Sequence, residues 1–349
     1  MSRPESDGSS RMRALAASLP SGLLSGFRAG REIAPPADSR PTTVFMVGMG
    51  GSGIAGELAR GLVESETPLT VAVVRSPEPP RGLDRRSRVF LVSYSGNTWE
   101  TLQAYDAAGR AGAVRCVVTS GGELGERASS DGVPLLPVPG GMPPRSAVGH
   151  MLGGILGLLD PWFPESNEGR MQQVVDRAGP LIASYSRAKG PAAALAAKVG
   201  ERMPFVYAES SFLGLARRWK TQVEENAKRL AVFDEVPELF HNAIVGWDAT
   251  SRAEAGRIAV LLLEWAGEGP MTRKSLRYLE TLARARGATV IRVPIGPEDR
   301  LEALVGGISL GDYLSLHLAE RRKVDPYPVE AITRLKSTLG SPARAPRNH

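Results

Sequence analysis

The sequence holds one cysteine and four histidines among 349 residues. The single cysteine, Cys116, excludes an intrachain disulfide, and its place inside the apolar run 113–119 predicts a buried structural thiol. The chain has no His-x-His, no His-x-x-Glu-His and no cysteine pair, so the nitrogen and sulfur ligands of a transition-metal site are scarce. We therefore expect no metal site and disfavour a metal-dependent enzyme.

Long hydrophobic runs and aromatic residues are also few. No run reaches the ~20 uncharged apolar residues that span a bilayer, and residues 1–20 are polar and serine-rich without the apolar core of a secretory signal. The net charge of +6 is spread along the chain, and no aromatic residues interleave with the basic tail 344–347. These features predict a cytoplasmic globular protein that binds neither a membrane nor nucleic acid, with a surface that attracts small anionic metabolites.

Glycine and serine, by contrast, gather in two loops. Residues 44–53 and 89–98 each consist of a short apolar run, which predicts a buried strand, followed by small residues and then helix-forming sequence. Two such units indicate two strands of one parallel sheet that present their carboxyl ends to the same ligand. Backbone amides at helix N-termini, together with serine and threonine hydroxyls, favour an anion. The loops therefore predict a site for a phosphate ester.

Strand-like and helix-like stretches alternate along the chain, which predicts an α/β fold with doubly wound parallel sheets. The expected strands are 43–47, 69–74, 89–93, 114–119, 133–138, 205–208, 243–246, 258–263 and 289–293. We expect an extension over 1–40, disordered to residue 10 and then formed by short helices interrupted at Pro20. The expected domains are one α/β unit over 41–160 and a second, with a terminal helix, over 161–340, followed by a frayed tail over 341–349.

Residues 48–53 (Gly-Met-Gly-Gly-Ser-Gly) also satisfy the dinucleotide fingerprint G-x-G-x-x-G. In that motif an acidic residue follows about twenty positions later, at the end of the next strand. The strand expected there ends in Arg75, which suits a 2′-phosphate, so an NADP-dependent oxidoreductase is one alternative. The second loop has no role in a dinucleotide site, and we expect no cofactor.

The two loops together resemble the phosphosugar-binding signature of the sugar isomerase (SIS) fold. The second loop carries it most specifically, over 93–101 (Ser-Tyr-Ser-Gly-Asn-Thr-Trp-Glu-Thr). Three later motifs are similar to one branch, the metal-independent bifunctional phosphoglucose/phosphomannose isomerases: 218–220 (Arg-Trp-Lys), 225–228 (Glu-Asn-Ala-Lys) and 237–242 (Pro-Glu-Leu-Phe-His-Asn). The chain departs from the branch at 207–210 and at Glu224, where an amide is more usual.

The resemblance spans roughly 46–336 and implies two SIS-type, flavodoxin-like subdomains. It further implies a phosphosugar substrate and a homodimer with active sites at the interface. The implied phosphate-binding residues are Gly50, Gly51, Ser52, Ser93, Ser95 and Thr98. The implied catalytic residues are Glu225 as the base, His241 as a ring-opening group from the partner subunit, Arg145 and Lys336.

Isomerisation of an aldose phosphate to a ketose phosphate needs a base, a donor for oxyanion charge and a group that opens the sugar ring. Adjacent residues on a helix point about 100° apart, so only one of Glu224 and Glu225 can face a cleft. We expect Glu225 there, with Arg218, Lys220 and Lys228 available to pair with Glu224 on the outer face. The alternative is that Glu225 is an ordinary solvated charge.

The remaining candidates each have a structural alternative. An imidazole at His241 suits ring opening, but a histidine in a loop is often just an exposed polar residue. His150 and His317 fall in apolar helical stretches and are expected to be structural. Arg145 is expected on a loop at the end of the first sheet, where it would either stabilise enediol charge or be a surface cation. Lys336 is expected either to have a role in the site or to lie on a solvated helix face.

Together these features predict an isomerase that interconverts glucose 6-phosphate, and also mannose 6-phosphate, with fructose 6-phosphate. A phosphosugar-binding SIS protein without catalytic activity is a second possibility, because the same loops can bind without chemistry. The presence of both Glu225 and His241 argues for the enzyme.

Overall fold

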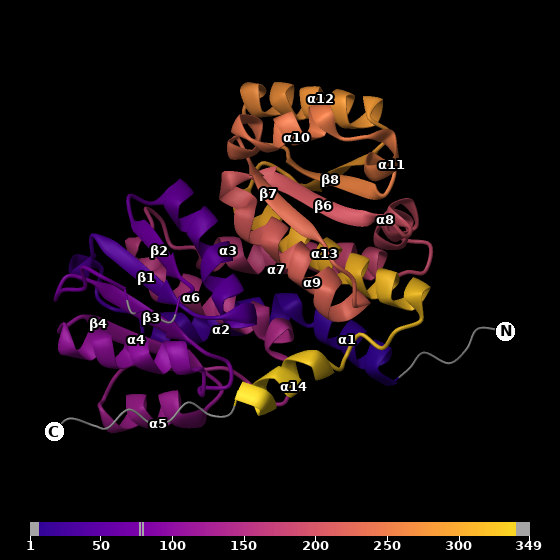
Figure 1. The fold of residues 1–349 in the computed structure, drawn as a ribbon. Helices are drawn as coiled ribbons and strands as arrows, with labels where there is room; N and C mark the ends of the chain where they lie inside the picture. The colour runs from indigo at the N-terminus through magenta and orange to yellow at the C-terminus, as the bar shows by residue number, and fades with distance from the viewer. Residues whose placement is uncertain (1–6, 77, 79, 340–349) are drawn as a thin grey trace.

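The computed structural model describes residues 7–76, 78 and 80–339, and its strands form two parallel sheets (Figure 1). The five-stranded sheet has the order β2-β1-β3-β4-β5 and the four-stranded sheet the order β7-β6-β8-β9. The strands are β1 (Thr43–Val47), β2 (Thr70–Val74), β3 (Arg88–Val92), β4 (Val114–Thr119), β5 (Leu135–Pro137), β6 (Met203–Glu209), β7 (Val232–Val236), β8 (Ile258–Trp265) and β9 (Thr289–Gly296). The predicted α/β class is confirmed.

Both sheets follow the flavodoxin-like order. The first strand in sequence lies inside each sheet, the second pairs on one side of it and the third on the other. The chain therefore diverges to opposite sides at the carboxyl ends of β1 and β3, and such a switch point is where open α/β sheets bind ligands. The two glycine- and serine-rich loops follow β1 and β3.

Helices cover both faces of each sheet, which explains the near-continuous apolar strands. The described helices are α1 (Asp7–Ala17), α2 (Leu19–Glu32), α3 (Gly50–Glu66), α4 (Trp99–Arg110), α5 (Gly122–Ser130), α6 (Val148–Leu159), α7 (Glu168–Tyr185), α8 (Pro191–Val199), α9 (Leu213–Ala227), α10 (Ala243–Ala249), α11 (Arg252–Ala255), α12 (Pro270–Ala285), α13 (Arg300–Arg322) and α14 (Glu330–Leu339). Short 3-10 turns include η2 (Pro144–Ala147), η4 (Ser210–Phe212) and η5 (Glu238–His241).

The two sheets share one hydrophobic layer. Helices α4 and α5 cover the outer face of the first sheet, and α10 and α12 cover the outer face of the second (Figure 1). The inner faces of both sheets contribute to a single cluster together with α2, α3, α6, α9 and α13, so that Val44 of β1 and Leu261 of β8 belong to the same core. The distance between the sheets is thus fixed by close packing.

The N-terminal extension is more ordered than predicted. Residues 7–10, expected to be disordered, lie in α1, while residues 1–6 and the tail expected over 341–349 are outside the described residues. Pro20 does not interrupt a helix, because it occupies the first turn of α2, where its missing N–H is no loss. Leu23 and Phe27 of α2 are fully buried against α6. The described part of the extension therefore contributes to the core.

One predicted strand is wrong. Residues 243–246 form the start of α10, because the Asn242 side chain accepts a hydrogen bond from the Ala243 amide over 2.5 Å and caps the helix. The strand in this part of the chain is β7. It was not predicted because Asp234 and Glu235 interrupt the apolar pattern. β7 lies at the edge of its sheet, where charged residues are common.

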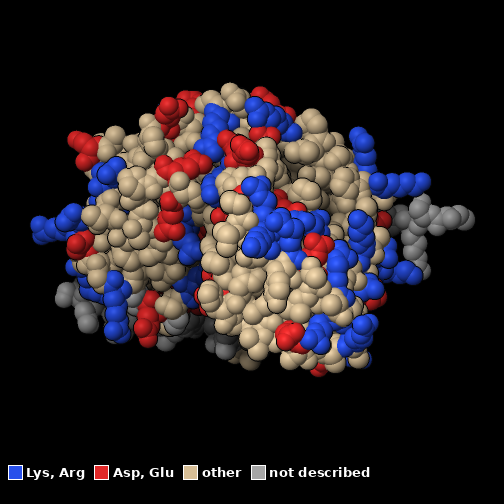
Figure 2. Space-filling view, turned by 90° about the horizontal axis from the view of Figure 1, so that it is seen from above, with Lys and Arg blue, Asp and Glu red and all other residues tan. Residues whose placement is uncertain are grey.

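The surface seen from above in Figure 2 carries both signs of charge. Lys and Arg side chains stand among Asp and Glu, although several basic residues gather near the middle of this face.

Within the described ranges, no helix combines the length and the apolar character that crossing a membrane requires.

A buried carboxyl group in the loop after β8 makes a stability prediction. Glu268 is 2% exposed, and burial raises its pKa from 4.5 to about 7, with Glu264 and Glu209 adding to the shift. The folded protein binds this proton more tightly than the unfolded chain, so the stabilisation is complete below pH 4.5 and is lost as the pH rises to about 7. Glu268→Gln should therefore raise the free energy of unfolding by up to about 3 kcal/mol at pH 8.

The measurement is urea denaturation of both proteins between pH 5 and pH 8. The difference between them should shrink towards pH 5. Glu298→Gln, at an exposed position, is the control and should follow the wild type. A constant difference across this pH range would contradict the assignment.

Candidate active site

The two predicted phosphate loops lie in direct contact at the carboxyl ends of β1 and β3. Residues 50–52 form the first turn of α3, and Thr98 immediately precedes α4. The Tyr94 amide donates a hydrogen bond to Ser52 Oγ over 3.0 Å, which joins the loops. Ser93 Oγ donates to Thr98 Oγ1 over 3.0 Å and closes the second loop on itself.

The residues of the two loops differ in their exposure. Gly50 and Ser95 are exposed and Thr98 is half-buried, whereas Ser52 and Ser93 are buried. Two helices, α3 and α4, begin at this edge, so that both direct the positive end of a helix dipole towards it. The structure thus brings together all six predicted phosphate-binding residues in a setting that favours an anion.

Arg145 connects these loops to the second half of the chain. It lies in η2, and a Cβ on Gly51 would stand 3.1 Å from the Arg145 amide, so its backbone packs against the first turn of α3. The side chain is not a surface cation, because the residue is only 3% exposed. Its guanidinium donates to Asn226 Oδ1 (2.9 Å), Glu225 Oε2 (3.3 Å), and the carbonyls of Pro326 (2.8 Å) and Tyr327 (3.0 Å).

The charge of Arg145 is costly to bury and is retained through these partners. Burial lowers the pKa of Arg145, and the Glu225 carboxylate opposes this change. A guanidinium remains protonated under such conditions. Arg145 therefore places a positive charge directly beside Glu225.

Glu225 faces this charge, and Glu224 faces away. Both lie in the last turn of α9, and the Glu225 side chain is 27% exposed. Glu224 pairs with Lys220 over 2.7 Å on the outer face of the helix. The two adjacent carboxylates thus occupy different environments: Glu225 pairs with the buried Arg145, whereas Glu224 pairs with the more exposed Lys220.

The other two predicted partners of Glu224 bind elsewhere. Arg218 pairs with Asp312 of α13 over 2.7 Å. Lys228 follows α9 in a left-handed conformation, and burial lowers its pKa. The carbonyls that accept from Lys228 Nζ belong to Glu225 (2.5 Å), Pro328 (2.6 Å) and Pro326 (3.5 Å). Lys228 thus ties the end of α9 to residues 325–328.

A pocket of about 670 Å³ opens beside Glu225 between α9 and α14. Its lining is mostly apolar on the α14 side. The residues are Thr221, Glu224, Glu225, Lys228, Val324, Asp325, Pro328, Val329, Glu330, Ala331, Ile332 and Arg334. The pocket gives Glu225 access to a small molecule.

Two predicted residues are not joined to this group. His241 ends η5 and is exposed, and within the described residues no hydrogen bond or ion pair links it to Glu225 or Arg145. Lys336 lies on α14, and its side chain is outside the described part of the structure.

The structure also shows the surroundings of Cys116, His317 and Arg75. Cys116 is buried in β4, and burial raises the pKa of its thiol to about 12, as suits a structural residue. His317 is 3% exposed and its Nε2 donates to the Tyr185 carbonyl over 3.0 Å. Arg75 donates to the Gly53 carbonyl (2.8 Å) and to Glu57 (2.7 Å), so its guanidinium is already engaged and is poorly suited to a 2′-phosphate. Among the described residues, no three His, Cys, Asp or Glu side chains are grouped so as to hold a metal ion.

Sequence reasoning missed Asn226 and Asp312. Asn226 accepts from Arg145 and donates to Ser315 Oγ over 2.8 Å. Asp312 is an isolated acid in the largely apolar run 303–319, and a carboxylate in such a run requires a partner. An acid within an apolar run is visible in the sequence, although this pattern does not identify Arg218 as its partner.

The fold is that of SIS proteins. A solved structure, the C-terminal domain of glucosamine-fructose-6-phosphate aminotransferase from Francisella tularensis, superposes with a TM-score of 0.69 at 12% identity, over 90% of this chain and 96% of that one. A family model described as "Bacterial phospho-glucose isomerase C-terminal SIS domain" matches residues 188–339. The predicted SIS-type fold is confirmed.

Relatives narrow the class to one family. A bifunctional phosphoglucose/phosphomannose isomerase from Caldicellulosiruptor bescii is 31% identical over 329 residues, which cover 92% of this chain and 96% of the relative. One from Aquifex aeolicus is 32% identical over 299 residues, or 85% of this chain and 90% of the relative. The chain belongs to the bifunctional phosphoglucose/phosphomannose isomerase family, an enzyme family, as the sequence motifs predicted.

The phosphate loops make a testable prediction at Gly96. Its φ of +68° is left-handed, and an added Cβ would come within 1.8 Å of the Gly121 carbonyl oxygen, so the loop must move. Gly132 has a similar φ of +64° but nothing within 4 Å of an added Cβ. Gly132→Ala should cost only the left-handed strain of about 1 kcal/mol. Gly96→Ala should cost more and should also weaken binding of fructose 6-phosphate at least ~10-fold, because displaced hydroxyls lose their geometry.

Isothermal calorimetry and thermal unfolding of both variants provide the comparison. Equal affinities in the two variants would show that the 93–98 loop does not hold the ligand.

Proposed function

We propose that this enzyme, a sugar-phosphate isomerase by family, interconverts glucose 6-phosphate and mannose 6-phosphate with fructose 6-phosphate through a cis-enediol. The phosphate group binds to the loops after β1 and β3, and Glu225 acts as the base. The unit 41–160 then supplies the phosphate site, and the unit 161–340 supplies the base. No metal takes part in the proposed route.

One observation carries this proposal: Arg145 packs its backbone against Gly51 and its guanidinium against Glu225. The phosphate loops and the carboxylate are therefore about one arginine side chain apart. That length is comparable to the carbon chain of a hexose phosphate, so a substrate anchored at the loops would present its C1–C2 end to Glu225.

The chemistry follows from the charges. Glu225 removes the proton from C2 of the open-chain aldose and returns it to C1 of the enediol, while a proton moves from the C2 hydroxyl to the C1 oxygen, which gives the ketose. Arg145 stabilises the negative charge that develops on the enediol oxygens. We also propose that Lys336, on α14 beside the pocket, approaches the substrate.

We propose further that the enzyme is a homodimer in which His241 serves the site of the partner subunit. His241 is exposed and is not joined to Glu225 within one chain. A histidine that shuttles a proton between the ring oxygen and the anomeric hydroxyl must reach the substrate, and a second copy can supply it.

The base can be tested with adjacent glutamates. Glu225→Gln should lower kcat at least ~100-fold for both hexose phosphates, because the base is removed while the packing is kept. Affinity for fructose 6-phosphate should change by less than about threefold, since the phosphate loops are untouched. Glu224→Gln is the matched control and should retain near wild-type kcat.

The assay follows fructose 6-phosphate production from glucose and mannose 6-phosphates side by side, in the presence of EDTA. If the wild type binds these esters but produces no fructose 6-phosphate, the protein is a phosphosugar-binding SIS protein instead. Equal losses in the two glutamine variants would remove Glu225 from its role.

The origin of the histidine can be tested by mixing two inactive variants. Glu225→Gln and His241→Asn subunits, unfolded and refolded together, should form hybrid dimers in which one site has both native residues. Random assembly then restores roughly a quarter of the wild-type activity. No recovery, with hybrid dimers demonstrated by native mass spectrometry, would mean that histidine and glutamate act within one subunit.

A further inference from the structure

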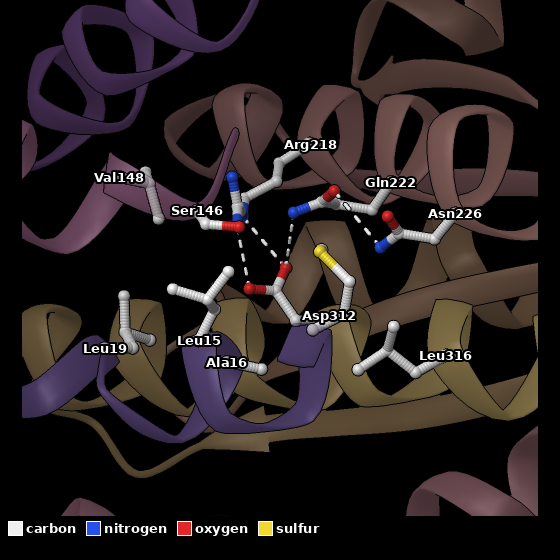
Figure 3. Close-up of a pocket in the computed structure, with 11 residues that line it drawn as sticks. Leu15, Ala16, Leu19, Ser146, Val148, Arg218, Gln222, Asn226, Asp312 and Leu316 are labelled. Carbon is white, nitrogen blue, oxygen red and sulfur yellow. Dashed lines mark hydrogen bonds and ion pairs between the residues drawn. The ribbon is translucent and has the colours of Figure 1, made fainter. Parts of the chain in front are cut away.

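A buried ion pair lies behind the site and takes no part in the chemistry described so far. Arg218 is 1% exposed and Asp312 is 7% exposed, and they form a two-pronged contact, Nε to Oδ1 over 3.0 Å and Nη2 to Oδ2 over 2.7 Å. Figure 3 shows the Asp312 carboxylate facing both Arg218 and Gln222, which donates to Oδ1 over 3.0 Å. The carboxylate is thus held by two side chains of α9.

This pair also holds the backbone of Arg145. Both Nη1 and Nη2 of Arg218 donate to the Arg145 carbonyl over 3.2 Å. From there the Arg145 guanidinium reaches Glu225 Oε2 and Asn226 Oδ1. A continuous chain of contacts therefore runs from Asp312 of α13, through Arg218 and Arg145, to Glu225.

The network also fixes the rotation of α9. Arg218, Gln222 and Asn226 recur every fourth residue, so they lie on one face of the helix. All three bond to α13, the first two at Asp312 and the third at Ser315. Glu225 lies next to the last of them in sequence, so this polar face sets the direction of its side chain.

The network is not a ligand site. The cavity between it and Met12, Leu15, Ala16 and Leu19 has a volume of about 10 Å³, too small for anything larger than a single water molecule (Figure 3). Burying an ion pair rarely increases stability over an apolar replacement of the same size. The pair is better explained by what it positions than by what it binds or stabilises.

We propose that Asp312 and Arg218 are positioning residues for the isomerase reaction. They hold the Arg145 backbone, and through it the Arg145 guanidinium, in the place that orients the Glu225 carboxylate. This inference rests on the proposed function and assigns Arg218, the first residue of the Arg-Trp-Lys motif, its role.

The first test is Asp312→Asn, which keeps the shape of the side chain but leaves the Arg218 charge without its counter-ion. It should lower kcat about 10- to 100-fold, as expected when a reacting group is displaced by roughly 1 Å. KM for fructose 6-phosphate should change less than about threefold, because the phosphate loops do not contact this pair. Asp160→Asn is the matched control: Asp160 is 5% exposed and pairs with Arg31 over 3.1 Å at the end of α6. It should lower the melting temperature while kcat stays near the wild-type value.

Arg218→Lys provides a second variant if Asp312→Asn does not fold. It keeps a positive charge beside Asp312, but a single ammonium cannot hold both carboxylate oxygens and the Arg145 carbonyl. Its kcat should fall with KM little changed. Normal kcat in a folded Arg218→Lys enzyme would overturn the proposal.

A double-mutant cycle separates positioning from general destabilisation. In the Glu225→Gln background, Asp312→Asn should reduce the residual kcat by less than about twofold, because the group that it orients is already gone. A full multiplicative loss would overturn the proposal and leave the proposed function intact. A wild-type enzyme without isomerase activity would instead reject the proposed function itself.

Discussion

The arrangement of this molecule depends on one buried guanidinium. Arg145 is enclosed by an asparagine, a carboxylate and two backbone carbonyls, and each satisfies a donor that would otherwise be costly to bury. These partners come from α9 and from the segment that precedes α14, while the backbone of Arg145 lies against the first turn of α3. Three parts of the chain that are distant in sequence can meet only in the geometry that satisfies this one charge.

The shared inner layer makes that geometry rigid. The phosphate loops belong to the first sheet, and Glu225 belongs to a helix that packs on the second. If the two sheets were joined only by a linker, the distance between the two loops and Glu225 would vary with each domain motion. Because both inner faces contribute to one core, close packing fixes the distance between the two loops and Glu225.

Local patterns predicted the parts of the site that are local. The two loops were recognisable because strand, glycine turn and helix are contiguous in sequence. The 100° rotation between adjacent helical residues predicted that only one of Glu224 and Glu225 faces a cleft. The partners of Arg145 were not predictable in the same way, since Pro326 and Tyr327 contribute only carbonyls, which any residue has. β7 was missed for a similar reason: its pairing with β6 outweighs its charged sequence, and no short-range pattern records that.

The polar face of α9 explains how a single glutamate is selected from two. A rotation of α9 by one residue would bring Glu224 towards Arg145 and turn Glu225 to solvent, and apolar packing alone discriminates weakly between such rotations because it lacks direction. Hydrogen bonds are directional, and those of Arg218, Gln222 and Asn226 to α13 are satisfied together in one rotation of the helix. These buried polar groups add less stability than apolar side chains of the same size would. They instead fix the rotation of α9 that places Glu225, and not Glu224, beside Arg145, which aliphatic packing alone would not do.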